Sequence, residues 1–418
     1  MKKYKIGIFG AGRGVDDSYA FRKLNCEIVA LCDFSEDRLK FGLSRLGDVP
    51  TYTDFDEFLN CGMDAVVIAN YFHEHTPYII KCFEKGIHVY CECITNGTLA
   101  EGVELMRAYK KNTKSIFFLA ENYPQTRYNL EIQKICKGGS LGKLLYAEGE
   151  YCHPISSDNI GFLEQFNYFP QHWRNYIPIS YYLSHSLGPV MSATGATPKT
   201  VTAFAAFEPI VGDIPSADRC ADRVAIIKTQ NDDGSIFHFT GCAEFGAHHR
   251  STRVCGTEGQ VESIRGMGDN KIMLRYNKWS IPEGLEEDNL IDLEWDDPDA
   301  ELIKTSGHGG SDYVTTRMFL QCIEENRQPD FPLNLEAAVT MSCTAILAHR
   351  SILNGGKPYA IPDFNNEEDC KLFENDRLSP FYGTDGSEPT IPCCTQTDYA
   401  PEERQLQNYL KVLGLDKK

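Results

Sequence analysis

Long apolar runs are missing from this sequence of 418 residues. No stretch approaches the roughly 18 apolar residues that a membrane-spanning helix needs, so we expect no membrane partner. The lysine-rich start, residues 1–5, lacks the continuous apolar segment of a secretory signal, because glycines interrupt it at once. These absences favour a cytoplasmic protein.

Positive charge is also scarce. The 41 lysines and arginines are outnumbered by 59 aspartates and glutamates, which gives a formal net charge of −18. A field of that sign repels phosphate backbones and anionic lipid. We therefore expect neither nucleic acid nor a membrane surface as a partner.

Cysteine is plentiful, with 16 residues, but the spacing Cys-x-x-Cys is absent. The only close pairs are Cys91-x-Cys93 and Cys393-Cys394, and no second ligand pair with zinc spacing accompanies them. In a long chain without a secretory signal, such cysteines indicate reduced thiols. We expect no metal site.

The first part of the chain alternates short apolar runs with amphipathic segments. Continuous apolar runs of this length suit strands buried on both faces of a parallel sheet, and they span residues 4–9, 27–33, 64–69, 87–92 and 115–121. Helices are predicted over residues 35–45, 76–85 and 99–110, the last opened by the capping box of Thr98 and Glu101. This alternation predicts a doubly wound α/β domain of the Rossmann type over residues 1–125.

The pattern changes after residue 125. Further strands are expected at residues 144–151 and 201–207, then three consecutive antiparallel segments at 224–230, 235–244 and 251–263, with turn residues between them. Helices are expected at 311–327 and 334–354. We predict a C-terminal α+β domain with a large open, mostly antiparallel sheet over residues 126–364. Since an exposed face of an open sheet often pairs with another copy, we expect a homo-oligomer.

The remaining residues, 365–418, are rich in proline, glycine and acids and show little periodicity. We expect a surface arm that ends in a short helix near residues 401–413.

A dinucleotide-binding turn follows the first predicted strand. Gly10, Gly12 and Gly14 surround Arg13, and such a turn exposes backbone N–H groups to a pyrophosphate at a helix N-terminus. The third position of the usual fingerprint is Val15, so the match is partial. Arg13 is expected to contact adenine or a phosphate, with a solvated loop arginine as the alternative.

Asp33 ends the next strand about 20 residues later, where a carboxylate accepts hydrogen bonds from ribose hydroxyls and repels a 2′-phosphate. The cofactor is therefore predicted to be NAD, although the nearby Arg38 leaves NADP open.

Motifs farther along the chain resemble the Gfo/Idh/MocA family of sugar-handling oxidoreductases. They are the segment 64–70 ending in Asn70, the sequence His73-Glu74-His75, and the segment 86–92 ending in Glu92. The resemblance covers about residues 4–363. It implies an N-terminal Rossmann domain, a C-terminal domain with a large open antiparallel sheet, and a carbohydrate or glycoside as substrate.

Two departures from that family stand out. Glu92-Cys93-Ile94 replaces the usual Glu-Lys-Pro, whose lysine serves hydride transfer, and Tyr181 replaces the usual aspartate four residues before His185. Both departures resemble the NAD-dependent glycoside hydrolase branch, typified by α-N-acetylgalactosaminidase. The segment 184–189, Ser-His-Ser-Leu-Gly-Pro, is the most specific of the motifs that fit this branch.

The branch implies hydrolysis by transient oxidation. NAD takes a hydride from carbon 3 of a glycoside, a base removes the proton at carbon 2, the aglycone leaves, water adds, and the hydride returns. Two alternatives remain: a sugar or glycoside dehydrogenase of the same fold, and a non-catalytic NAD-sensing regulator. The missing lysine argues against the dehydrogenase, but His185 can also serve as its base.

Four residues are candidate catalytic groups. Tyr182 and His185 lie three apart at the start of a predicted helix, so both can face one pocket. We expect Tyr182 to handle the proton at carbon 2 and His185 to bond the hydroxyl being oxidised. Glu121 ends the fifth strand and is expected to exchange protons with the leaving group, whereas His308 lies on a glycine loop before a helix. Core packing, capping and turn formation are the structural alternatives.

Other candidates are expected to hold the cofactor or the sugar. Glu92 is expected at the ribose or nicotinamide, and one of His73 and His75 at the nicotinamide amide rather than as a metal pair. The remaining candidates are Asn70 at the cofactor and His153, Trp173 and Arg174 at the sugar, the last two also near the cofactor.

Overall fold

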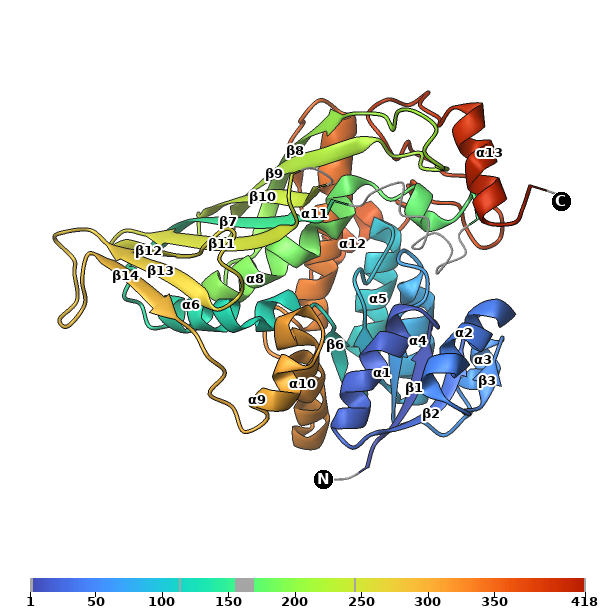
Figure 1. Ribbon diagram of the computed structural model, residues 1–418, viewed down its shortest axis with the longest axis horizontal. Helices are drawn as coiled ribbons and strands as arrows, with labels where there is room; N and C mark the ends of the chain where they lie inside the picture. The colour runs from blue at the N-terminus through green and yellow to red at the C-terminus, as the bar shows by residue number, and fades with distance from the viewer. Residues whose placement is uncertain (1–2, 113, 155–168, 244–245, 417–418) are drawn as a thin grey trace.

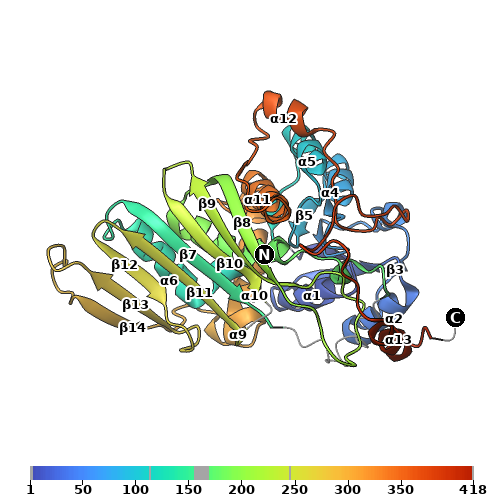
Figure 2. The same cartoon turned by 90° about the horizontal axis from the view of Figure 1, so that it is seen from above.

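The structure, a computed structural model, describes residues 3–112, 114–154, 169–243 and 246–416. It has two sheets, which lie on opposite sides of a set of central helices (Figures 1 and 2). Within these residues, no helix is both long and apolar enough to cross a bilayer.

The first sheet has six strands in the order β3-β2-β1-β4-β5-β6, and every pairing is parallel. The strands are β1 (Lys5–Phe9), β2 (Glu27–Cys32), β3 (Thr51–Tyr52), β4 (Ala65–Ile68), β5 (His88–Cys91) and β6 (Phe117–Leu119). This confirms the predicted Rossmann-type sheet. The strand order reverses between β1 and β4, and ligands of such sheets bind in the crevice beyond the carboxyl ends of the strands at that point.

The helices between these strands are α1 (Arg13–Lys23), α2 (Glu36–Leu46), α3 (Phe55–Phe58), α4 (His75–Lys85) and α5 (Leu99–Lys111). The three predicted helices correspond to α2, α4 and α5, and their ends differ from the prediction by at most one residue. The predicted capping box opens α5: the Thr98 hydroxyl accepts from Glu101 N at 3.2 Å, and the Glu101 carboxylate accepts from Thr98 N at 2.9 Å.

The second sheet has nine strands in the order β14-β13-β12-β11-β7-β10-β9-β8-β15. They are β7 (Leu144–Cys152), β8 (Pro198–Phe207), β9 (Asp222–Asn231), β10 (Ile236–Ala243), β11 (His249–Gly256), β12 (Gly259–Ser263), β13 (Lys271–Tyr276), β14 (Asp288–Asp292) and β15 (Tyr359–Ala360). The predicted run of consecutive antiparallel strands is wrong at one point. β7 lies between β10 and β11 and pairs with β10 in parallel. It therefore occupies the strand edges through which β10 and β11 would have paired with each other in a hairpin.

Helices cover one face of this sheet and fill the space between the two sheets. They are η1 (Tyr123–Gln125), α6 (Arg127–Lys137), η2 (Trp173–Asn175), η3 (Ile179–Leu183), α8 (Ser184–Thr194), α9 (Ala300–Lys304), η4 (His308–Gly310), α10 (Ser311–Glu325) and α11 (Leu335–Leu353). α8 can approach β7 closely because Gly149 has no side chain. A Cβ there would lie 2.6 Å from the Ser186 carbonyl oxygen. The opposite face bears no helix of the described chain in either view and exposes Phe204 and Ile236.

The C-terminal arm contains α12 (Glu367–Phe373) and α13 (Glu403–Val412), so the short helix predicted near residues 401–413 is present. The arm is anchored to α11 at two points. Arg350 donates to both oxygens of Asp376 at 2.6 Å, and Nε2 of His349 lies 2.7 Å from the Pro392 carbonyl oxygen.

Candidate active site

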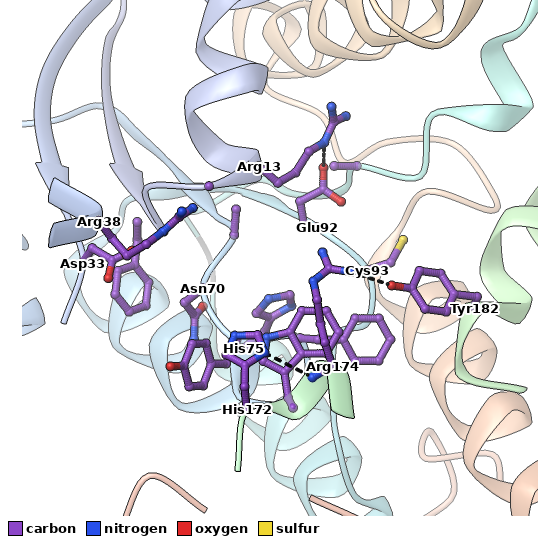
Figure 3. Close-up of a pocket in the computed structure, with 18 of the residues that line it drawn as sticks. Arg13, Asp33, Arg38, Asn70, His75, Glu92, Cys93, His172, Arg174 and Tyr182 are labelled. Carbon is purple, nitrogen blue, oxygen red and sulfur yellow. Dashed lines mark hydrogen bonds and ion pairs between the residues drawn. The ribbon is translucent and has the colours of Figure 1, made fainter. Parts of the chain in front are cut away.

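One cavity of about 480 Å³ lies beyond the carboxyl ends of the first sheet and reaches the helices under the second (Figure 3). We call the part lined by Gly10, Gly12 and Asp33 the cofactor end, and the part lined by Tyr182, His185 and His308 the substrate end. The glycine turn and the predicted catalytic histidine therefore face the same space, which hydride chemistry requires.

Backbone geometry forms the cofactor end. Gly10 has a φ of +102°, and a Cβ there would lie 2.1 Å from the Ala69 carbonyl oxygen, so no other residue fits. Gly12 is the N-cap of α1 and leaves the helix N-terminus open to the cavity. Such an N-terminus binds a pyrophosphate through its free N–H groups.

The third glycine of the turn has a different role. Gly14 does not line the cavity; a Cβ there would lie 2.8 Å from Ile8 Cγ2, so the residue brings α1 close to β1. The partial match at Val15 is compensated from α2, where Gly42 leaves room for Val15 and for Leu31. Gly14 thus has a packing role, and its contact with the cofactor stays a prediction.

Asp33 stands beside the turn at the end of β2. Its Oδ2 accepts from Ala11 N at 2.8 Å and its Oδ1 from Ser35 N at 2.9 Å. The side chain of Arg38 lies over Gly12, since a Cβ on that glycine would be 2.8 Å from the Arg38 guanidinium. Figure 3 shows Asp33 and Arg38 on the same side of the cavity, away from Cys93 and Tyr182.

Arg13 joins three carboxylates instead of projecting alone into the cavity. Its guanidinium lies 3.0 Å from Asp17, from Glu92 and from Asp312 (Figure 3 draws the Glu92 contact). Burial acts to lower the pKa of Arg13, but the three carboxylates outweigh burial and raise it. The residue stays charged and ties α1 to β5 and α10.

Two polar atoms beside this end are suited to the cofactor. Asn70 and His75 line the cavity, and their Oδ1 and Nε2 atoms are buried without a hydrogen-bond partner in the described part of the chain. A buried polar atom without a partner is costly, so a ligand amide that bonds these atoms would be favoured. Together with the glycine turn, they fit a dinucleotide.

A histidine–carboxylate pair forms the core of the substrate end. Nδ1 of His185 lies 2.8 Å from Oε2 of Glu121, whose side chain is fully buried. Burial acts to raise the pKa of Glu121, but the His185 charge and hydrogen bond outweigh it and lower the pKa. Glu121 stays ionised, fixes the ring and leaves Nε2 as the nitrogen that points away from the carboxylate.

Close packing allows this pair to form. A Cβ at Gly188, one turn after His185, would lie 2.9 Å from Glu121 Cγ. Cys93 also contacts the pair, since its thiol donates to Oε2 of Glu121 at 3.3 Å. Burial, followed by the Glu121 and Glu92 charges, raises the pKa of Cys93, so this thiol is no base.

A second histidine–carboxylate pair lies across Tyr123 from the first. Nδ1 of His308 is 2.9 Å from Oδ2 of Asp312, and Asn122 donates to Oδ1 of Asp312 at 2.6 Å. The Tyr123 ring centre lies 5.0 Å from that of His185 and 5.7 Å from that of His308. Burial acts to raise the pKa of Asp312, but Arg13 and then His308 hold it well below its usual range.

Tyr182 is held by Arg174, whose Nη1 donates to the phenol oxygen at 3.1 Å (Figure 3). A cationic donor at this distance stabilises negative charge on the oxygen. Arg174 also lies 4.4 Å from the centre of the Trp173 ring, which stacks on Phe72 at 5.2 Å. All four side chains line the cavity.

Family comparisons agree with this arrangement. Residues 4–119 match the model described as "Oxidoreductase family, NAD-binding Rossmann fold", and residues 225–369 match "Glycosyl hydrolase 109, C-terminal domain". The chain is similar to the Gfo/Idh/MocA oxidoreductases in its first part and to the glycosyl hydrolase 109 branch in its second. It binds NAD and is an enzyme that acts on sugars.

Individual relatives support the same assignment. A glycosyl hydrolase family 109 protein from Akkermansia muciniphila is 26% identical over 373 residues, which cover 81% of this chain and 77% of that protein. One from Porphyromonas gingivalis is 24% identical and covers 87% and 85% of the two chains. In fold, the chain is similar to levoglucosan dehydrogenase in complex with NADH and levoglucosan, with a TM-score of 0.72, 16% identity, and coverage of 87% and 100%.

Besides Gly14, three predicted site residues do not line the cavity. Glu121 lies behind His185, so its predicted direct contact with the leaving group lacks geometric support. His73 is buried against Phe381, and its Nε2 lies 3.2 Å from the Tyr382 carbonyl oxygen. His153 packs against Tyr151 and His248 instead.

Tyr181 occupies the position of the family's usual aspartate and takes no catalytic role. Tyr181 is fully buried and packs against Phe381 and His349. The structure therefore separates the adjacent tyrosines, Tyr181 in the core and Tyr182 in the cavity.

Sequence reasoning missed three contributors to the site. Asp312 bonds both Arg13 and His308, and its place just after the glycine loop was the available signal. Tyr123 stands between the two histidines. Thr384 lines the cavity from the C-terminal arm, and no periodic pattern indicated that contact.

Proposed function

We propose that this NAD-dependent sugar-active enzyme is a glycoside hydrolase that works by transient oxidation at carbon 3 of the sugar. The observation that carries the proposal is the single cavity in which an NAD cradle meets two histidine–carboxylate pairs. Cys93 replaces the family's lysine there, and its thiol remains protonated. Proton transfer therefore depends on the histidines and Tyr182.

Bound NAD supplies the hydride acceptor and, at the end of the cycle, the hydride donor. In this proposal, Nε2 of His185 bonds the hydroxyl that is oxidised. As that hydroxyl loses its proton, the imidazole becomes positively charged, and the ionised Glu121 at 2.8 Å stabilises this charge. Glu121 thus acts through His185 as a positioning residue.

Tyr182 is the candidate base for carbon 2. A ketone at carbon 3 acidifies the neighbouring C–H, and a phenolate can remove its proton. Arg174 supports that role, because its guanidinium at 3.1 Å stabilises the phenolate. Proton removal then expels the aglycone from carbon 1.

His308 is the candidate acid for the leaving group and base for the incoming water. It lies at the mouth of the substrate end with 38% of its side chain exposed, where an aglycone and water both have access. Asp312 orients its ring as Glu121 orients that of His185. Two oriented imidazoles allow one to serve carbon 3 while the other serves carbon 1.

The decisive experiment offers aryl glycosides to the purified protein without added NAD. Aglycone release with no net rise in NADH absorbance, together with deuterium incorporation at carbon 2 in heavy water, is the expected result. Tyr182→Phe should abolish the deuterium incorporation while NAD binding is retained. Release of the aglycone without any exchange at carbon 2 would overturn the elimination step.

A sugar dehydrogenase is the second candidate. The fold similarity to levoglucosan dehydrogenase favours it, and His185 with Glu121 can act as the base for a simple oxidation. In that case NADH accumulates only when NAD is supplied, and no aglycone is released.

We further propose a homo-oligomer in the cytoplasm. The uncovered face of the second sheet exposes Phe204, Ile236 and Leu290 by 61%, 50% and 53%. Such a patch favours pairing with a second copy. Light scattering should give more than one chain per particle, and Phe204→Glu should reduce that number.

A further inference from the structure

A cluster of thiols lies where the C-terminal arm meets the start of β9, away from the NAD cavity. Cys220, Asp222 and Cys394 each offer one ligand atom, and these atoms all lie within 4.8 Å of one another. All three residues are buried, with exposed fractions of 6%, 3% and 2%. Cys393 is buried beside them in the same small core.

The bonds inside this cluster resemble those of a metal-thiolate site. The Ala221 N–H donates to the sulfur of Cys394 at 3.4 Å, a contact that stabilises a thiolate. The Thr395 N–H donates to Oδ2 of Asp222 at 3.0 Å and orients its carboxylate. The Cys394 thiol lies 3.5 Å from Oδ1 of the same carboxylate.

Charge balance gives a second, independent argument. Among the described residues, no lysine or arginine forms an ion pair with Asp222; the nearby Arg223 instead pairs with Asp218 at 3.5 Å. The buried Asp222 carboxylate accepts hydrogen bonds from the Thr395 N–H, the Thr395 hydroxyl and the Cys394 thiol, but none of these donors carries a positive charge. Burial of a charge without an opposite charge is costly, and a bound cation would compensate it.

We propose that Cys220, Asp222 and Cys394 bind a structural zinc ion, with Cys393 available as a fourth ligand. Two thiolates, one carboxylate and a tetrahedral fourth position are a ligand set that zinc accepts. Binding displaces the proton from each ligating thiol, which the cation's charge compensates. A disulfide would use two of the three sulfur atoms and leave the buried Asp222 charge unmatched.

The position of the cluster explains what such an ion would do. The arm has little periodic core of its own, yet Thr384 and the backbone of Tyr382 reach the active-site region. Tyr176 packs on the thiol cluster and lies 5.2 Å, ring centre to ring centre, from Tyr382. The ion would fasten the arm to β9 and so fix the cavity wall that the arm provides.

The test uses the full chain without a histidine tag, purified under reducing conditions. Metal analysis should find about one zinc ion per chain, and cobalt replacement should give thiolate-to-metal charge-transfer and tetrahedral ligand-field bands. Cys394→Ser and Asp222→Asn should each lose the stoichiometric metal. Cys136→Ala, which removes a buried thiol on α6, should keep it.

Three results would overturn the proposal. They are a chain free of stoichiometric metal after purification and incubation with zinc, equal zinc content in wild type and Asp222→Asn, and a native mass two hydrogens lighter with a Cys220–Cys393 or Cys220–Cys394 crosslink. The outcome does not depend on the proposed hydrolase activity, because metal content and the cobalt spectrum are measured without substrate.

Discussion

The two ends of the cavity differ in whether backbone or side chains form them. The cofactor end consists largely of backbone from one contiguous turn, and its decisive residue is a glycine at φ +102°. The substrate end consists of side chains from α8, α10 and the segments around β6, arranged as histidine–carboxylate pairs. One end therefore depends on chain conformation and the other on the position of protons.

Gly10→Ala should have the largest effect and should act on the cofactor end. The new Cβ would lie 2.1 Å from the Ala69 carbonyl oxygen in a strained backbone conformation. We expect NAD affinity to fall at least about a hundredfold, which corresponds to about 3 kcal/mol. Calorimetric titration with NAD measures this.

The matched control is Gly47→Ala. Gly47 also has a positive φ, +83°, but open space surrounds it. This variant should lose about 1–3 kcal/mol of folding free energy and bind NAD normally. Equal losses of NAD affinity in both variants would show that general strain, rather than the cradle, sets the effect.

Glu121→Gln should separate the two ends. The substitution keeps the volume but removes the charge that stabilises protonated His185. We expect kcat to fall by roughly 10²–10⁴ while the Kd for NAD stays unchanged. Steady-state kinetics and NAD titration measure the two quantities.

Glu101→Gln is the control, because this half-buried carboxylate caps α5 and does not line the cavity. It should leave kcat unchanged. A loss of NAD affinity in Glu121→Gln comparable to its loss of kcat would contradict the division between the ends.

His349 tests whether the arm beside the substrate end responds to protons. Burial, opposed by the Pro392 hydrogen bond, lowers its pKa from 6.5 to about 4. Between these values the unfolded chain holds a proton that the folded chain does not. The free energy of unfolding should therefore be highest above pH 6.5 and should decrease as the pH drops toward 4. This residue should account for a decrease on the order of 3 kcal/mol.

Urea unfolding across this pH range gives the measurement. His349→Gln should flatten the slope, whereas substitution of the exposed His248 by Gln should preserve it. An unchanged slope in His349→Gln would assign the pH dependence to other groups.

Asp33→Asn should have the smallest effect. Without its negative charge, the site should repel a 2′-phosphate less, and the preference for NAD over NADP should fall roughly tenfold. Titration with both cofactors measures the ratio. Asp37→Asn removes an exposed acid on the neighbouring helix and should leave the ratio alone; a parallel change there would indicate a general charge effect.

Prediction from the sequence succeeded where the information is local. Gly10, Asp33 and the Thr98–Glu101 capping box each follow from a few neighbouring residues, and the structure contains all three features. The alternating apolar runs likewise gave the parallel sheet. The residue pattern of one strand does not indicate which other strand it pairs with, however. The insertion of β7 between β10 and β11 was therefore not predicted.

The substrate end was predicted as separate residues but not as an arrangement. His185 and Glu121 were both candidates, yet their direct contact depends on Gly188, which lets α8 approach. The bond between His308 and Asp312 was missed, although the residues are close in sequence. A long-range contact such as that between His185 and Glu121 depends on how helices pack, which local residue patterns do not specify.

The wall supplied by Thr384 has a consequence for how this enzyme and its relatives diverge. The matched glycosyl hydrolase domain ends at residue 369, so this piece of wall lies outside both matched domains. Mutations there can reshape the entrance without disturbing the NAD cradle or either imidazole. Selection can thus change which sugar enters while the reaction chemistry is inherited intact.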